Sequence, residues 1–259
     1  MHFIVSPRVR QEELHIWWAH RRDFDLAIPV LRSVLSPSEQ ARAEQFRLHR
    51  DKDNYIIRRG MLRILLSSYV GQSPSSLNFT IGTNGRPELQ SYLGRDGIHY
   101  SLSQSGDVAL YAVTGACPVG VDVEYLQPIP HCEQKAREFF PQAEAESLMV
   151  LPEEFRVKRF FDLWTRKEAL LKAMGVGLGS GRCYISQTAP MGPNLKRLSE
   201  ASHLSTGWYV HSFSPVTGYV GAVAYRKPNL DLICRGTPAF FSEELRTSDR
   251  NVLRTQTGT

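Results

Sequence analysis

One stretch of the chain, residues 160–177, constrains the fold more than any other; it reads FFDLWTRKEALLKAMGVG. Residues 160–174 favour helix, and Gly175 is typical of the residue at which a helix ends. At about 100° per residue, its large apolar side chains fall on one stripe. They are Phe160, Leu163, Trp164, Leu170, Leu171 and Met174. The stretch therefore predicts a helix that packs one side against a core.

The charged residues of this helix allow two interpretations. Glu168 and Lys172 lie four residues apart at the edge of the stripe, as an ordinary surface ion pair would. Lys167 falls inside the stripe, where a lysine is expected to extend to solvent or to find a partner. An amphipathic core helix with a surface pair explains these residues unless a second acidic element lies nearby.

A second acidic element does occur upstream, in the segment VGVDVE at residues 119–124. Its three valines alternate with polar residues, which predicts a strand whose opposite face carries Asp122 and Glu124, about 6–7 Å apart at the backbone. Like charges this close are unfavourable unless they are solvated, protonated or bridged by a cation. Oxygen ligands of this kind suit Mg²⁺, although the pattern alone is weak evidence for a metal.

The N-terminal part of the chain carries a basic segment. Ser36, Pro37 and Glu39 form a helix start with a capping box, and a second helix is expected over residues 52–70. Between residues 42 and 63 there are seven Lys or Arg against three Asp or Glu. These side chains are either solvated helix faces or a phosphate site, for which arginine offers paired donors.

Composition excludes several classes of protein. The 259 residues carry 31 Lys and Arg against 26 Asp and Glu, a mild excess that permits an anionic partner. No run approaches the roughly 20 apolar residues of a membrane span, and the N-terminus has too short an apolar run for a signal peptide. The basic segment lacks interleaved aromatics and any nucleic-acid motif. We expect a cytoplasmic protein that binds neither membranes nor nucleic acid.

Together, the two acidic elements resemble the signature of the Sfp-type 4'-phosphopantetheinyl transferases. The segment GVDVE at 120–124 precedes WTRKEALLKAMGVGL at 164–178 by some forty residues, and W-x-x-K-E-A resembles one subgroup of that family. Other segments follow in the family's order: LSPSE at 35–39, G-R-P at 85–87 and FF-x-x-x-E at 139–144. The resemblance covers residues 14 to 226.

The resemblance implies an α+β fold in which two similar α/β halves form an intramolecular pseudo-dimer. Residues 1–118 would contact the phosphates of coenzyme A, residues 119–228 would bind Mg²⁺ and catalyse, and residues 229–259 would be a poorly ordered tail. The implied enzyme is a monomer of the holo-acyl-carrier-protein synthase type. It would move the 4'-phosphopantetheine arm of coenzyme A to a serine of an apo acyl or peptidyl carrier protein, giving adenosine 3',5'-bisphosphate.

The family's motifs also imply roles for individual residues. The Mg²⁺ ligands would be Asp122, Glu124 and Glu168, and the catalytic residues Glu144, Lys172 and Glu168. The contacts to coenzyme A would be Arg42, Arg59, Arg86, Ser103, Gln104 and Lys167. Two alternatives stay open: Arg58 could take the place of Arg59, and metal-bound water could replace Glu144 as the base for the carrier serine.

One departure from the family concerns Gln104. The family has a histidine between two hydroxyl residues, whereas this chain has Ser103-Gln104-Ser105. Because an amide can donate a hydrogen bond but carries no charge, we expect weaker binding of coenzyme A rather than loss of activity. A homologue that binds carriers without catalysis is the alternative, and the retained charged residues argue against it. We also expect the loop with Leu126 and Ile129 to meet the carrier.

Overall fold

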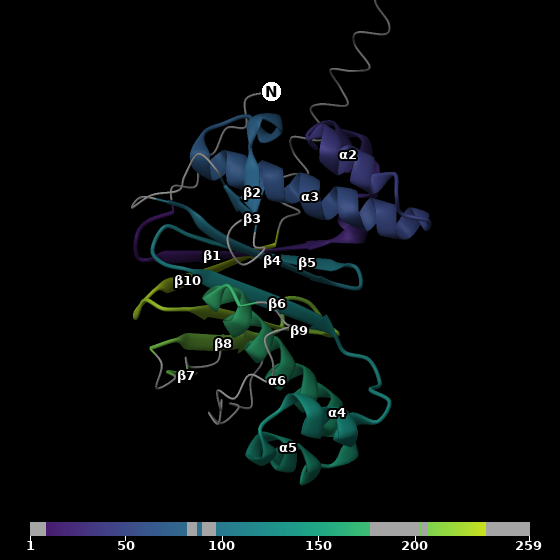
Figure 1. Ribbon diagram of the computed structural model, residues 1–259, viewed down its shortest axis with the longest axis vertical. Helices are drawn as coiled ribbons and strands as arrows, with labels where there is room; N and C mark the ends of the chain where they lie inside the picture. Colours follow the sequence, from purple (N-terminus) through teal and green to yellow (C-terminus); the bar gives the residue numbers. More distant parts are fainter. Residues whose placement is uncertain (1–8, 82–86, 90–96, 177–201, 204–206, 237–259) are drawn as a thin grey trace, which may run out of the picture.

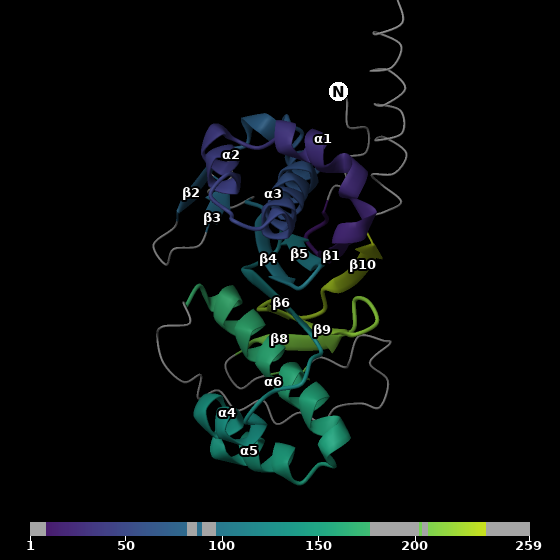
Figure 2. The same cartoon turned by 90° about the vertical axis from the view of Figure 1, so that its right-hand side faces the viewer.

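The structure is a computed structural model that describes residues 9–81, 87–89, 97–176, 202–203 and 207–236 (Figures 1 and 2). Two four-stranded sheets lie at its centre, and helices cover the outer side of each. The sequence of layers is therefore helix, sheet, sheet, helix, one of the few ways in which two sheets can bury both faces. This mixed α and β architecture agrees with the predicted α+β class.

The N-terminal sheet has the strand order β10-β1-β5-β4. Its strands are β1 (Glu13–His20), β4 (His99–Ser105), β5 (Val108–Thr114) and β10 (Asp231–Gly236). Strands β1, β5 and β4 pair antiparallel, whereas β10 runs parallel to β1. A short antiparallel pair, β2 (Phe79–Ile81) and β3 (Pro87–Leu89), lies beside this half.

Helices cover the outer face of this sheet, and the longest is α3 (His49–Val70), close to the predicted range. The shorter helices are α1 (Ile28–Ser33), α2 (Pro37–Ala43) and the 3-10 turns Arg21–Asp23, Asp25–Ala27 and Pro74–Ser76. The predicted capping box at the start of α2 is confirmed, because Ser36 and Glu39 cap each other's backbone N–H groups. Within the parts of the chain that the structure describes, no helix is long and apolar enough to span a bilayer.

The C-terminal sheet is antiparallel, in the order β6-β9-β8-β7. Its strands are β6 (Val119–Tyr125), β7 (Ser202–His203), β8 (Tyr209–Phe213) and β9 (Tyr219–Tyr225). The predicted strand at 119–124 is confirmed, and β8 and β9 pair as an antiparallel hairpin. Helix α6 (Glu153–Met174) lies on this sheet, and α4 (Cys132–Phe139) and α5 (Gln142–Met149) pack on the part of α6 that extends beyond it.

Alternating side chains let the two sheets share one core. Leu14 and Ile16 of β1 and Leu110 of β5 pack with Val121 and Val123 of β6 in a single apolar cluster between the sheets. The residues between them along β1 and β5, such as Trp17 and Tyr111, point instead into the core beneath α3. This period of two is what a strand with both faces covered requires.

Helix α6 differs from its prediction in its start, at Glu153 rather than near residue 160, and in its burial. It ends where expected, with Gly175 at a φ of 70°, but nearly every side chain from Phe160 to Leu170 is buried. The prediction that the helix packs against a core is confirmed, and the alternative interpretation of Glu168 and Lys172 as an ordinary surface pair is excluded because Glu168 is buried. The sheet covers one side of α6, and α4 and α5 cover another (Figure 1). Gly120 of β6 permits the close packing, since a Cβ there would lie 1.9 Å from the carbonyl oxygen of Ala169.

The end of the described chain corrects a second prediction. Residues 231–236, which were expected to belong to a poorly ordered tail, form β10 on the edge of the N-terminal sheet. Leu232 packs against the shared core, and Gly236 lies against the ring of Trp18. The chain thus returns to the first half, so residue 228 does not end the ordered structure. Residues 237–259 lie outside the described residues.

Candidate active site

The predicted site residues that come together do so where β4, β6 and α6 meet. Asp122 on β6 is 4% exposed, and its Oδ1 accepts hydrogen bonds from Lys172 Nζ at 2.7 Å and from Ser103 Oγ at 2.7 Å. Lys172 Nζ also donates to Ser103 Oγ at 2.9 Å. One strand from each half and the last turn of α6 therefore form a closed triangle of polar contacts.

Glu124 lies two residues further along the same face of β6. Its Oε2 accepts a hydrogen bond from Ser105 Oγ at 2.6 Å. Burial raises the pKa of Glu124, and the nearby Asp122 carboxylate adds to the effect. The two carboxylates thus share one face of β6, as the alternation predicted.

Glu168 brings a third carboxylate to this group from α6. It is 7% exposed, and burial raises its pKa to about 7, with Asp122 and Glu124 adding to the rise and Lys172 opposing it. Burial likewise raises the pKa of Asp122. All three carboxylates therefore interact electrostatically with Lys172, and among the described residues of the site the acidic groups outnumber this lysine.

A divalent cation fits this group by charge and by chemistry. Asp122 Oδ2 is buried and has no hydrogen-bond partner among the residues that the structure describes, so one carboxylate oxygen is left for a ligand. Hard oxygen donors with excess negative charge are what Mg²⁺ binds. Among the described residues, however, no three acidic, histidine or cysteine side chains are already grouped in metal-binding geometry. The fit thus rests on the charge imbalance and on the unpaired oxygen.

Glu144, the predicted base, lies in a different environment. It is buried on α5, and its Oε2 lies 3.1 Å from the Nζ of Lys167, which also lies over the ring of Phe140. The expectation that Lys167 finds a partner is confirmed. Lys167 and Glu168 are neighbours on α6 but face different groups, so the structure places Glu144 beside Lys167 rather than in the Asp122 triangle. Its role as the base stays a prediction.

The predicted coenzyme A contacts of the first half are largely engaged with protein. Arg59 donates from Nε to Glu39 Oε1 at 2.8 Å, and Arg63 donates to Oε2 of the same carboxylate at 2.6 Å. Arg42 is exposed and donates to Gln45 Oε1 at 2.7 Å. Arg58, the alternative to Arg59, has a buried Nε for which the described part of the chain offers no hydrogen-bond partner. Arg86 lies outside the described residues.

The hydroxyls of β4 have roles that the sequence prediction missed in part. Ser103 was expected to contact phosphate, and in the structure it donates to Asp122. Ser101 and Ser105 were not predicted to take part, yet they bond to the backbone N–H groups of Val121 and Tyr125. The sequence pattern that could have indicated these contacts is the serine at every second position of β4, which places the three hydroxyls on one face of the strand. The amide of Gln104 donates to the carbonyl of Gly106, at 3.4 Å.

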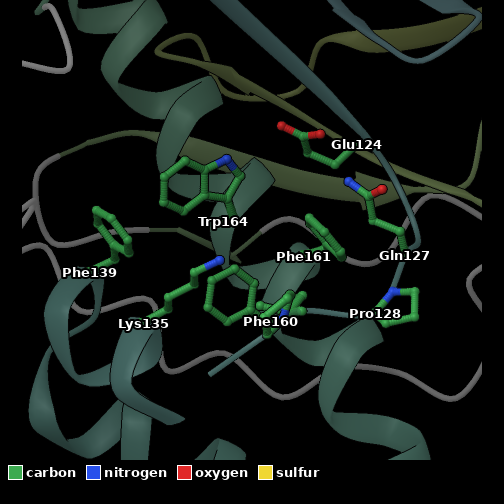
Figure 3. Close-up of a pocket in the computed structure, with 10 residues that line it drawn as sticks. Glu124, Gln127, Pro128, Lys135, Phe139, Phe160, Phe161 and Trp164 are labelled. Atoms are coloured by element: carbon green, nitrogen blue, oxygen red, sulfur yellow. The ribbon is translucent and has the colours of Figure 1, made fainter. Parts of the chain in front are cut away.

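An apolar groove of about 410 Å³ opens beside Glu124, between the 127–130 segment, α4 and α6. Figure 3 shows Glu124 and Gln127 at one end of the groove, and Lys135 and Phe139 at the other. Its walls are mostly aromatic or proline side chains, with Phe160, Phe161 and Trp164 from α6. Ile129 and Leu126, both predicted to meet a carrier, pack against the apolar cluster beneath the groove, and Ile129 also lines the groove itself.

The chain is similar to known proteins over the region that contains this site. Residues 118–224 match the family described as the 4'-phosphopantetheinyl transferase superfamily. The chain is 36% identical over 167 residues to the 4'-phosphopantetheinyl transferase HetI of Nostoc sp., covering 64% of this chain and 70% of the relative. It is 29% identical over 201 residues to the 4'-phosphopantetheinyl transferase psf-1 of Bacillus pumilus, covering 78% and 83%.

A third relative is the putative 4'-phosphopantetheinyl transferase slr0495 of Synechocystis sp., at 37% identity over 154 residues. That match spans 60% of this chain and 62% of the relative. The family match at 118–224 contains the three carboxylates, Glu144, Lys167 and Lys172, whereas the β4 serines precede it.

Proposed function

Because the chain belongs to the 4'-phosphopantetheinyl transferase superfamily, we propose that it transfers the 4'-phosphopantetheine arm of coenzyme A to a serine of an apo acyl or peptidyl carrier protein. The other product is adenosine 3',5'-bisphosphate, and the enzyme is of the holo-acyl-carrier-protein synthase type. The observation that carries the proposal is the group formed by the buried Asp122 and Glu168, the half-buried Glu124 and Lys172. We further propose that the two halves form an intramolecular pseudo-dimer and that the enzyme is a cytoplasmic monomer.

The three carboxylates and Lys172, here called the acidic group, would have different roles in the reaction. Asp122, Glu124 and Glu168 would hold Mg²⁺, which when bound would neutralise charge on the pyrophosphate of coenzyme A. Lys172 is held on Asp122 and Ser103, so its ammonium is fixed at the edge of the same site. Phosphoryl transfer through a loose transition state depends on such alignment and charge neutralisation more than on covalent help from the protein.

The remaining predicted residues supply binding and proton transfer in this proposal. Glu144 would take the proton of the carrier serine. The contacts to coenzyme A would be Arg42, Arg59, Arg86, Ser103, Gln104 and Lys167. Since Glu144 is buried against Lys167, that pair is the part of the site that the carrier serine must approach. The groove beside Glu124 offers an apolar surface next to the acidic group, and we assign it to contact with the carrier through Ile129.

A mass spectrum of an apo carrier protein tests the proposed activity. After incubation with this protein, coenzyme A and Mg²⁺, the carrier should gain the mass of one phosphopantetheine arm. The gain should disappear with a chelator or with Glu168→Ala. An unchanged carrier mass for acyl and peptidyl carriers alike, with a protein that binds coenzyme A, would contradict the proposed transfer.

A separate substitution tests the carrier contact. We expect Ile129→Asp to raise the KM for the carrier and to leave the KM for coenzyme A unchanged, because the new charge lies in the apolar groove. An unchanged carrier KM would exclude this surface as the docking site.

A further inference from the structure

The two sheets meet where β4 lies beside β6, and serine side chains of β4 hydrogen-bond to backbone N–H groups of β6 there. Strands β4 and β6 are edge strands of different sheets. Ser101 Oγ accepts the backbone N–H of Val121 at 3.1 Å, and Ser105 Oγ accepts that of Tyr125 at 3.1 Å. These hydroxyls satisfy N–H groups on the edge of β6 that would otherwise have no strand partner.

The N–H of Tyr125 fixes the direction in which the Ser105 hydroxyl points. A hydroxyl has one proton, and a backbone N–H can only donate. Because Ser105 accepts from Tyr125, its own proton is available for Glu124 Oε2, which lies 2.6 Å away. Ser101 has the same backbone role, but within the described part of the chain it makes no hydrogen bond to a carboxylate.

A hydrogen bond that fixes the carboxylate matters more for Glu124 than for Asp122. Asp122 is short, nearly fully buried and bonded to both Ser103 and Lys172. Glu124 has a longer side chain, is only half-buried and lies at the mouth of the groove (Figure 3). A free glutamate side chain loses rotamer entropy when it is fixed, so a partner that holds one oxygen in advance reduces that loss on ligand binding.

We propose that Ser105 is a positioning residue for the Glu124 carboxylate, so that the N-terminal half sets the geometry of the cation site in the C-terminal half. The inference rests on the proposed function, because it concerns the cation and the coenzyme A pyrophosphate that the site would bind. Groups that orient metal ligands in this way typically contribute 10–100-fold to metal affinity.

The test measures the Mg²⁺ concentration at which coenzyme A half-maximally raises the Tm of the protein. We expect Ser105→Ala to raise that concentration about 10-fold. Ser105→Thr keeps the hydroxyl and should restore most of the affinity. Ser101→Ala is the matched control, because it also removes a hydrogen bond from a backbone N–H of β6 to a serine of β4. It should therefore lower the Tm without ligand but keep the wild-type Mg²⁺ requirement.

A double substitution separates positioning from a general loss of packing. If Ser105 acts through Glu124, Ser105→Ala should add no further change to the Mg²⁺ requirement of Glu124→Gln. If Ser105→Ala fails to fold, Ser105→Cys keeps the side-chain volume with a weaker donor and takes its place in both measurements.

The possible results distinguish the inference from the proposed function. Equal Mg²⁺ requirements for Ser105→Ala and Ser101→Ala, or additive effects in the double variant, would overturn the positioning role. A wild-type protein that coenzyme A stabilises equally with and without Mg²⁺ would instead contradict the proposed function.

Discussion

Two buried charged groups in this molecule have opposite electrostatic balance. In the first half, Glu39 is enclosed by Arg59 and Arg63 and accepts the N–H of Ser36. Burial alone would raise its pKa, but these partners outweigh burial and lower it. In the second half, three carboxylates share Lys172, and the pKa of Glu168 is raised to about 7. The first group is electrostatically satisfied, as a structural element requires, whereas the second is left with negative charge that a ligand can neutralise.

The acidic group should be essential for activity but not for folding. We expect Glu168→Gln to lower kcat/KM by about 10²–10³-fold, the range found when one electrostatic contact to a transition state is removed. The free energy of unfolding should stay the same or rise, because the substitution removes one of three like charges in a buried site. Carrier-modification kinetics and urea denaturation of the same variant measure both. A large loss of stability would place Glu168 among the structural residues.

The arginine-rich group should show the reverse pattern. We expect Glu39→Gln to lower the free energy of unfolding by about 3 kcal/mol, because it leaves the buried Arg63 without its carboxylate and weakens the cap of α2. Urea denaturation gives the value, and Glu44→Gln on the exposed surface is the control. If the two variants are equally stable, the Glu39 group does not stabilise the fold.

Lowering the pH should reduce the contribution of the Glu39 carboxylate to the free energy of unfolding. The folded pKa of Glu39 lies below its ordinary value of 4.5, so the unfolded chain binds the proton first as the pH falls. Its contribution to stability is therefore present above pH 4.5 and is lost as the pH falls through the lower folded pKa. Between pH 6 and pH 3, the free energy of unfolding should fall more steeply for the wild type than for Glu39→Gln. Parallel curves would contradict the depressed pKa.

The smallest effect is expected at Gln104. Replacing Gln104 by His would exchange a neutral donor for one that can carry charge, and a charge-assisted hydrogen bond is about twice as strong as a neutral one. We expect Gln104→His to lower the KM for coenzyme A by about fivefold, which corresponds to about 1 kcal/mol. A KM that does not change would show that the residue at this position does not contact coenzyme A.

The sequence predicted those parts of the fold and site that depend on neighbours along the chain. Apolar alternation predicted β6, Gly175 predicted the end of α6, and residue types located the capping box at Ser36 and Glu39. The burial of α6 on several sides could not be predicted from the sequence, because it depends on Gly120 and on the packing of α4 and α5. Nor could β10 be predicted, because that strand is stabilised by pairing with β1, more than two hundred residues earlier.

The candidate site shows the same division between local and long-range information. The motifs placed Asp122, Glu124 and Glu168 together by residue type, and the structure brings these carboxylates into one electrostatic group. The partners of those residues come from other elements: Ser103 and Ser105 from β4, and Glu144 from α5 for Lys167. Such contacts depend on how the two sheets and α6 pack, which no local pattern specifies.

The most direct test of the central claim, that the acidic group is a cation-dependent coenzyme A site, is thermal denaturation with coenzyme A in Mg²⁺ or in EDTA. At a coenzyme A concentration of about 100 Kd, binding should stabilise the folded protein by about 2.7 kcal/mol. We predict that the Tm rises with coenzyme A and Mg²⁺ together, that EDTA removes most of the rise, and that Glu168→Gln removes it in Mg²⁺. A rise of equal size in EDTA, or one that Glu168→Gln leaves intact, would contradict the account.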